Sequence, residues 1–168
     1  DTSLRRAVML VAILNLAYFG IEFSVALLIA SVSLLADSVG FLEDAAVNFL
    51  VLLALSWSVS QRARVGMLLA GVLLVPAIAF LWALWDKITH PVPPEAFTLS
   101  VTAAGALLVN VVCAFILARF RDARGSLTKA AFLSARNDTL ANGAIIAAGL
   151  ATALWPSVWP DVVVGMGV

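Results

Sequence analysis

Acidic and carboxamide side chains interrupt the long apolar stretches of this sequence. Asp44 lies within one stretch and Asp138 within another. Carboxylate and carboxamide oxygens suit hard and borderline divalent cations. A charged side chain inside a bilayer costs about 2.5–3.5 kcal/mol on insertion scales, so it needs a partner or a function. The polar residues inside the apolar stretches are Glu22, Asp37, Glu43, Asp44, Arg136 and Asp138, with Asn15, Asn48, Asn110, Asn137 and Asn142.

Several of these residues gather on one face of a stretch if that stretch is helical. At about 100° per residue, Asp37, Asp44 and Asn48 share a face of one helix. Asp138 and Asn142 share a face of another. Since two bare carboxylates would repel, we predict that the two faces meet around a divalent cation or a proton. Interhelical hydrogen bonding by buried Asp and Asn is the alternative interpretation.

The remaining two acidic residues lie off these faces. Glu43 points about 100° away from Asp44, so we expect it to meet a neighbouring helix or to stay protonated. Glu22 lies in the outer half of the first apolar stretch and has two interpretations of equal weight. It is either a proton or ion relay, or a hydrogen-bonded contact between helices.

The elements that position these residues are membrane-spanning helices. Of the 168 residues, 63% are hydrophobic and only 12% are charged, which argues against a water-soluble globule. A last apolar run begins at Asp161, and we interpret it as a sixth helix that the sequence truncates. We therefore predict an all-α, polytopic membrane protein with a six-helix transmembrane bundle. One domain is expected over 1–168, with no cytoplasmic C-terminal domain. The expected helices cover about 7–30, 34–57, 66–85, 98–118, 131–154 and, incompletely, 161–168.

Basic residues predict the orientation of the bundle. Lys87 is the one basic residue expected on the outer side. By the positive-inside rule, the N-terminus is then cytoplasmic, and we expect the plasma (inner) membrane. The basic residues expected on the opposite, inner side are Arg5, Arg6, Arg62, Arg64, Arg119, Arg121, Arg124 and Lys129.

The polar residues fall at similar depths in this arrangement. With a rise of about 1.5 Å per residue, Asp44 lies roughly 15 Å from the outer end of its stretch. Asp138, Asn15 and Asn110 each lie roughly 12 Å from the inner end of theirs. We therefore expect a polar layer near the middle of the bilayer. Asp37, about 5 Å from the outer surface, would lie on an exit route.

Composition also limits the other function classes. The formal net charge is +0, so no nucleic-acid partner is expected. The single cysteine, Cys113, excludes a disulfide framework and a cysteine-based zinc finger. The sequence contains no nucleophile elbow, His-Glu-x-x-His motif or phosphate-binding glycine loop, so we expect no enzyme and no permanently bound cofactor.

The acidic stretches resemble helices of a known transporter family. The second-helix signature of cation diffusion facilitators (the cation efflux family) is similar to SVSLLADSVGFLEDA at 31–45, and their fifth helix is similar to SARNDTLANGAIIAAGL at 134–150. Supporting similarities follow in the family's order along almost the whole chain. They are LNLAYFGIE at 14–22, THPVPPEA at 89–96, LLVNVV at 107–112 and WPDVVVG at 159–165.

The resemblance implies a fold, an activity and a set of ligand positions. Family members have a six-helix transmembrane domain, usually form homodimers, and export divalent metals such as zinc in exchange for protons. Their metal site lies between helices 2 and 5, at positions that correspond here to 40, 44, 134 and 138. Asp44 and Asp138 match the family pattern, whereas Gly40 and Ser134 depart from it.

The departures predict an altered metal site. Asp37, Asn48, Asn137 and Asn142 could complete an oxygen-rich shell with water around Asp44 and Asp138, which would favour Mn²⁺, Fe²⁺, Co²⁺ or Mg²⁺ over tightly held Zn²⁺. The metal would be the substrate. The expected partners are a divalent cation, protons, the lipid bilayer and a second copy of the chain. The alternative is a non-transporting membrane scaffold or regulatory homologue that has lost part of the site.

Overall fold

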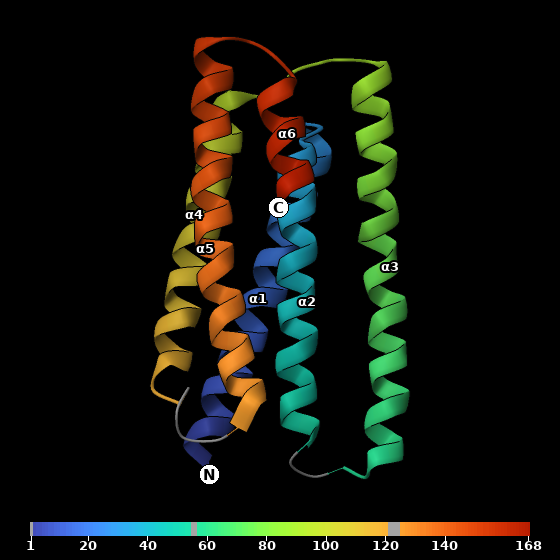
Figure 1. Cartoon of the computed structure of the whole chain (residues 1–168), viewed down its shortest axis with the longest axis vertical. Coiled ribbons are helices and arrows are strands. Elements are labelled where there is room, and N and C mark those ends of the chain that lie inside the picture. Colours follow the sequence, from blue (N-terminus) through green and yellow to red (C-terminus); the bar gives the residue numbers. More distant parts are fainter. Residues whose placement is uncertain (1, 55–56, 121–124) are drawn as a thin grey trace.

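The described part of the chain is helical throughout, apart from turns and short connections. The computed structural model describes residues 2–54, 57–120 and 125–168. This confirms the predicted all-α, six-helix architecture, and the described residues contain no strand. The helices are α1 (Thr2–Leu28), α2 (Val32–Ala54), α3 (Val59–Thr89), α4 (Ala96–Ala118), α5 (Gly125–Leu154) and α6 (Trp159–Gly167) (Figure 1).

Each helix begins before the apolar stretch that predicted it, because polar residues ahead of the apolar core also adopt helical structure, whereas α1 ends two residues earlier than predicted. The clearest case is α3, which begins with a capping box. Ser58 accepts a hydrogen bond from the backbone N–H of Gln61, and the Gln61 side chain accepts one from the backbone N–H of Ser58. These reciprocal bonds satisfy N–H groups that the helix itself leaves unpaired.

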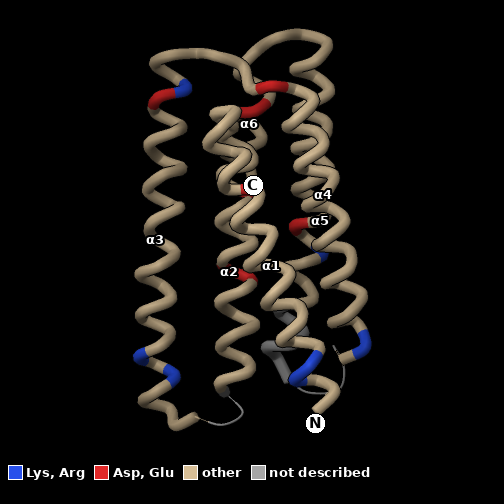
Figure 2. Tube along the Cα trace, turned by 180° about the vertical axis from the view of Figure 1, so that it is seen from behind, with Lys and Arg blue, Asp and Glu red and all other residues tan. Residues whose placement is uncertain are grey.

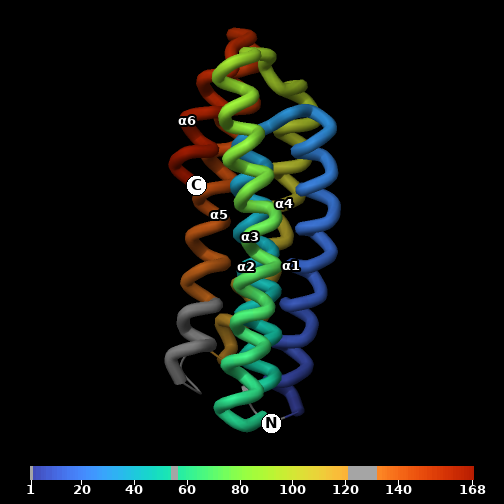
Figure 3. The backbone as a smooth tube through the Cα atoms, turned by 90° about the vertical axis from the view of Figure 1, so that its right-hand side faces the viewer, coloured from blue at the N-terminus to red at the C-terminus, as the bar shows by residue number. Residues whose placement is uncertain are grey.

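Four helices form the centre of the bundle, while α3 stands to one side. In the bundle α4 packs along α5 and α1 along α2, and α2 also contacts α5 and α6. Figure 1 shows α3 beside α2 and separated from the other helices, and the view from the side in Figure 3 shows it in front of the bundle. Only 6% of its most apolar window is buried. The rest of that surface is available to lipid.

Three described helices are each long and apolar enough to cross a membrane, namely α1, α3 and α4. The other two long helices, α2 and α5, do not meet this test on their own. Asp37, Glu43 and Asp44 lie in α2, and Arg136 and Asp138 lie in α5. These charges lower the hydropathy of the two helices that carry the acidic faces. Both helices pack against neighbours that cover those faces.

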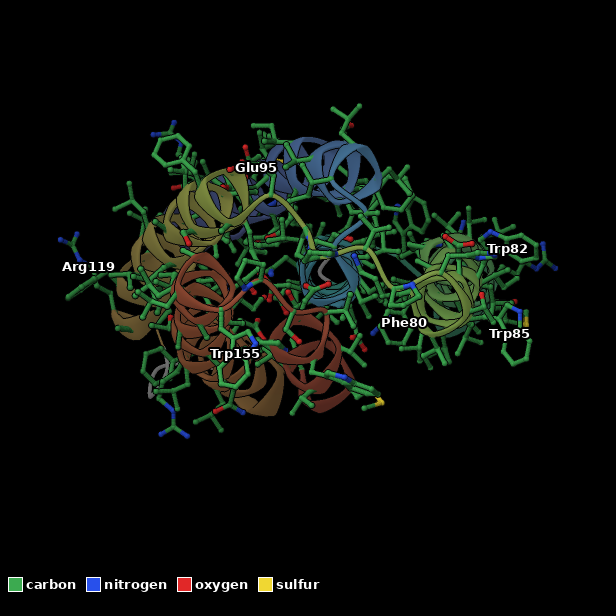
Figure 4. All side chains as sticks on the ribbon, turned by 90° about the horizontal axis from the view of Figure 1, so that it is seen from above. Phe80, Trp82, Trp85, Glu95, Arg119 and Trp155 are labelled. Atoms are coloured by element: carbon green, nitrogen blue, oxygen red, sulfur yellow. The ribbon has the colours of Figure 1, made fainter. Side chains whose placement is uncertain are left out.

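Tryptophan side chains mark one end of the bundle. Trp82 and Trp85 on α3 and Trp155 after α5 are all exposed and point outward when the bundle is viewed along its axis (Figure 4). Amphipathic indole rings prefer the interface between lipid and water. The three rings are therefore placed where anchoring in the interface is favourable.

At this same end, a buried aspartate from α6 holds the start of α2. The chain turns from α1 into α2 at Ala30, which has a left-handed φ of 51°. Asp161 is fully buried and accepts hydrogen bonds from the backbone N–H groups of Val32 (2.8 Å) and Ser33 (3.1 Å). It also accepts bonds from the hydroxyls of Ser31 (2.7 Å) and Ser33 (2.6 Å). A carboxylate at a helix N-terminus is favoured by the unpaired N–H groups and the helix dipole.

Two further contacts tie α3 and α6 to this point. The buried Lys87 ammonium lies 4.0 Å from Asp161 Oδ2 and donates a hydrogen bond to the carbonyl oxygen of Val92 (2.6 Å). Gly165 lies one turn after Asp161, and a Cβ there would come within 2.9 Å of the backbone nitrogen of Ser33. Sequence reasoning identified Asp161 only as the start of a sixth apolar run, because nothing local in the sequence indicates which helix end it contacts.

Replacing Asp161 is expected to destabilise the bundle. Asp161→Asn removes the negative charge and leaves the Lys87 ammonium buried without its partner, a loss that typically costs about 3–5 kcal/mol. We expect the free energy of unfolding in detergent micelles to fall by about that amount. Hydrogen exchange should also speed up at the Val32 and Ser33 amides.

Asp86→Asn is the matched control for this experiment. Asp86 lies in the last turn of α3, at the same end of the bundle. It is 59% exposed and pairs only with His90 in the described structure, so its removal should cost no more than about 1 kcal/mol. Equal effects of the two variants would show that Asp161 is not the anchor of α2.

Candidate metal centre

The interior of the bundle is polar between two apolar ends. One buried apolar cluster lies near the N-terminal end of α1, and a second lies near the opposite end. Each cluster takes residues from the same four helices, so the polar residues between them lie between two apolar layers. The first cluster is Leu4, Val8, Val11, Val51, Leu52, Cys113, Leu117 and Ala135, and the second is Ala26, Leu34, Leu35, Leu99, Ala103 and Ile145.

The two acidic faces meet between these apolar layers, where Asp138 is half-buried. Asp44 on α2 is buried, and its Oδ1 accepts a hydrogen bond from Ser134 Oγ on α5 (2.8 Å). Asp138 lies one turn along α5 from Ser134, and its carboxyl group is within hydrogen-bonding range of the Asp44 carboxyl group. The structure thus brings together the two residues that match the family's ligand positions. Their role as metal ligands stays a prediction.

A second acidic group lies on the outer side of the first. The carboxyl groups of Glu22 on α1 and Asp37 on α2 face each other, and the Asn142 side chain on α5 contacts Asp37. Asn142 Nδ2 donates to the backbone carbonyl oxygen of Asp138 (2.8 Å), which joins the two groups. Both Glu22 carboxyl oxygens, Asp37 Oδ2 and Asn142 Oδ1 are buried and have no hydrogen-bond donor among the described residues. Buried acceptors without donors are costly to leave unpaired and attract a cation or a proton.

Glu22 is the residue that the predicted ligand set left out. The structure favours neither of its two interpretations outright, but it places Glu22 directly beside Asp37. A signal was present in the sequence. Glu22 and Asp37 lie at similar distances along the chain from the short turn at Ala30, so an antiparallel hairpin brings them to one level.

The three predicted asparagine ligands have different environments. Asn142 belongs to the outer group described above. Asn48 is buried, and its Nδ2 donates to the backbone carbonyl oxygen of Asp44 (2.8 Å), while its Oδ1 has no partner in the described structure. Asn137 is exposed and accepts a hydrogen bond from Arg136 Nη2 (3.4 Å). The structure therefore does not bring Asn137 into the site, because adjacent residues of a helix point about 100° apart.

The other expected members of the polar layer lie between α1 and α4. Asn15 Oδ1 accepts a weak hydrogen bond from Cys113 Sγ (3.9 Å). Asn110, three residues before Cys113 on α4, is also buried. Tyr18 Oη donates to the backbone carbonyl oxygen of Thr102 (2.6 Å). These contacts are of the kind that holds membrane helices together.

The described residues offer few strong metal ligands at any one point. No group of three or more His, Cys, Asp or Glu side chains among them is placed to hold a metal ion. Gly40 contributes no side chain, and a Cβ at that position would have open space around it. Ser134 contributes a hydroxyl that is donated to Asp44. A cation bound at Asp44 and Asp138 would therefore need amide, hydroxyl or water oxygens to complete its shell.

The fold is a helical bundle in which three helices are long and apolar enough to cross a membrane. The sequence profile of the cation efflux transmembrane domain matches residues 8–168, and the chain belongs to the cation efflux family. No curated protein is similar enough to be matched with it. The match confirms the resemblance drawn from the sequence. It identifies the protein as a membrane cation transporter, a class distinct from enzymes.

A crosslinking experiment tests the meeting of the two carboxyl groups. In a Cys113→Ala background, we expect Asp44→Cys/Asp138→Cys to be joined by a short bifunctional thiol reagent, because the native carboxyl groups are in contact. Joined peptides would be detected by mass spectrometry after proteolysis. Glu43→Cys/Asp138→Cys is the matched control, since Glu43 is exposed on α2. Crosslinking of the control but not of the first pair would contradict the arrangement.

Proposed function

We propose that this chain exports divalent metal cations in exchange for protons through a site between α2 and α5. The contact between the buried Asp44 and the half-buried Asp138 is the observation that carries the proposal. Two carboxylates supply the two negative charges that a divalent cation needs. The apolar clusters on either side lower the local dielectric around the pair, which strengthens such an attraction.

The same pair links metal binding to proton binding. When the cation leaves, two like charges at short range in a low-dielectric interior would repel each other. A proton taken up between the carboxyl groups removes that repulsion. A site that holds either the metal or a proton, and is open to one side at a time, exchanges the two across the membrane.

The ligand set that we propose is rich in oxygen. Asp44 and Asp138 are its centre, and water together with Asn48 or Ser134 would complete the shell. Oxygen ligands favour Mn²⁺, Fe²⁺, Co²⁺ or Mg²⁺, whereas a tight Zn²⁺ site usually contains His or Cys. The outer group of Asp37, Asn142 and Glu22 would then serve the route between this site and the outer surface.

We further propose the orientation and assembly expected from the sequence. Arg6 lies in the second turn of α1, Arg64 in the second turn of α3 and Arg119 directly after α4, whereas Lys87 lies in the last turn of α3. Figure 2 shows most of the basic positions toward the end of the bundle that holds the N-terminus. This asymmetry supports a cytoplasmic N-terminus in the plasma membrane. The exposed apolar surface of α3 supports a homodimer in which a second copy covers part of it.

Removing either central carboxylate is expected to abolish transport. Asp44→Asn and Asp138→Asn keep the shape of the side chain and remove the charge. We expect uptake by proteoliposomes that contain a metal-sensitive dye to fall by more than about 100-fold, beyond the usual effect of losing an outer-shell partner. A pH-sensitive dye should report proton movement opposite to the metal in the wild type and none in the variants.

Glu43→Gln is the control, because Glu43 is the exposed neighbour of Asp44 on α2. It should transport at nearly the wild-type rate. Normal transport by both aspartate variants would refute the assignment of the site. A wild-type protein that is correctly inserted but moves none of the first-row divalent ions would refute the transport proposal as a whole.

The second candidate is a non-transporting homologue of the same fold. The absence of a group of three strong ligands among the described residues favours it, as do Gly40 and Ser134 at ligand positions of the family. Calorimetric titration with Mn²⁺, Co²⁺ and Zn²⁺ separates the two candidates. We expect the wild type to bind Mn²⁺ or Co²⁺, and Gly40→Asp/Ser134→His to bind Zn²⁺ more tightly. Binding that appears only in the variant would favour the non-transporting candidate.

A further inference from the structure

A cavity opens between α1 and α4 at the end of the bundle that holds the N-terminus. Its volume is about 500 Å³. The lining residues on α1 recur at the spacing of one helix face. Those on the α4 side belong to the end of that helix. The residues that matter for its chemistry are Arg6, Ala7 and Leu10 of α1, Phe115 and Ile116 of α4, and Arg119, which directly follows α4.

The lining is cationic at its polar end. Arg6 and Arg119 come from different helices and are both exposed. Neither forms an ion pair with any residue that the structure describes, and the described lining residues include no acidic side chain. Figure 4 shows Arg119 extending from α4 away from the axis of the bundle. Guanidinium groups bind phosphate oxygens through paired, charge-assisted hydrogen bonds.

The rest of the lining is apolar and faces outward. Leu10 is 48% exposed and Phe115 is 73% exposed, on helices that are each apolar enough to span a membrane. Soluble anions gain nothing from such a surface, whereas an acyl chain buries apolar area against it. Cationic groups above an apolar channel therefore match a ligand that has a charged head and a hydrocarbon tail. Basic pockets between membrane helices bind acidic lipid head groups in this way.

We propose that this cavity binds an anionic phospholipid, with its phosphate between Arg6 and Arg119 and an acyl chain along Leu10 and Phe115. The lipid would bridge the first and fourth helices at the arginine-rich end, where the protein packing between them opens. The site is separate from Asp44 and Asp138, so it does not depend on the proposed transport of metal. It would make the stability of the bundle depend on the head-group charge of the surrounding lipid.

Lipid titration of the full chain in detergent tests the proposal. Phosphatidylglycerol, phosphatidylcholine and the soluble head group glycerophosphoglycerol would each be added, with binding read by native mass spectrometry and by the shift in melting temperature. We expect phosphatidylglycerol to bind and to raise the melting temperature most. In Arg6→Gln/Arg119→Gln its apparent Kd should rise roughly tenfold or more, given about 1 kcal/mol for each basic residue near an acidic lipid.

Two controls separate a built site from general attraction to positive charge. Arg62→Gln/Arg64→Gln removes the same charge from α3, outside the cavity, and should change the Kd less than threefold. Ala7→Phe keeps every charge and fills the cavity, so it should weaken binding as much as the loss of both arginines. Equal losses in the two arginine variants would overturn the proposal. So would full binding by Ala7→Phe, or equal binding of the soluble head group.

Discussion

An ionised side chain in a membrane helix is costly to expose to lipid, and this cost orders most of the bundle, with Glu43 on α2 as the exposed exception. Insertion of one ionised group at the bilayer centre costs about 2.5–3.5 kcal/mol. Glu22, Asp37 and Asp44 are accordingly buried between helices, while most of the residues around them in the sequence are apolar. The pairing of α2 with α5 follows, because each is the helix whose polar face can cover the other's. The helix α3 has no acidic residue in its apolar middle, and it remains at the edge of the bundle.

Burial alone does not align two helices in register, and the ends of the bundle supply that alignment. Asp161 fixes the first turn of α2 to α6, and the close approach at Gly165 leaves little freedom to slide. A shift of α2 by one residue would turn Asp44 by about 100° and remove it from Ser134. Asp161 thus supports the position of Asp44 from the end of the bundle.

Much of this arrangement follows from periodicity in the sequence. The helices and the meeting of Asp44 with Asp138 could be predicted, since both depend on regular helix geometry along long apolar stretches. Asn137 is exposed, away from Asp138 and Asn142, because neighbours in sequence point to different faces of a helix. The contact of Asp161 with Ser31 could not be predicted, since it joins residues far apart in the chain through the packing of helix ends. The position of Glu22 beside Asp37 follows from the sequence only when the short turn at Ala30 is taken into account.

The charge balance of the interior is compatible with the proposed exchange of a cation for protons. Among the described residues, Lys87 is the buried basic side chain, and it is engaged by Asp161 at one end of the bundle. Arg136 on α5 is exposed. No described protein cation is thus in place to neutralise Asp44, Asp138, Asp37 or Glu22. A fixed arginine among them would hold the carboxylates permanently and exclude a mobile cation, whereas hydroxyl and amide partners orient them and leave their charge to be balanced by an ion that can leave.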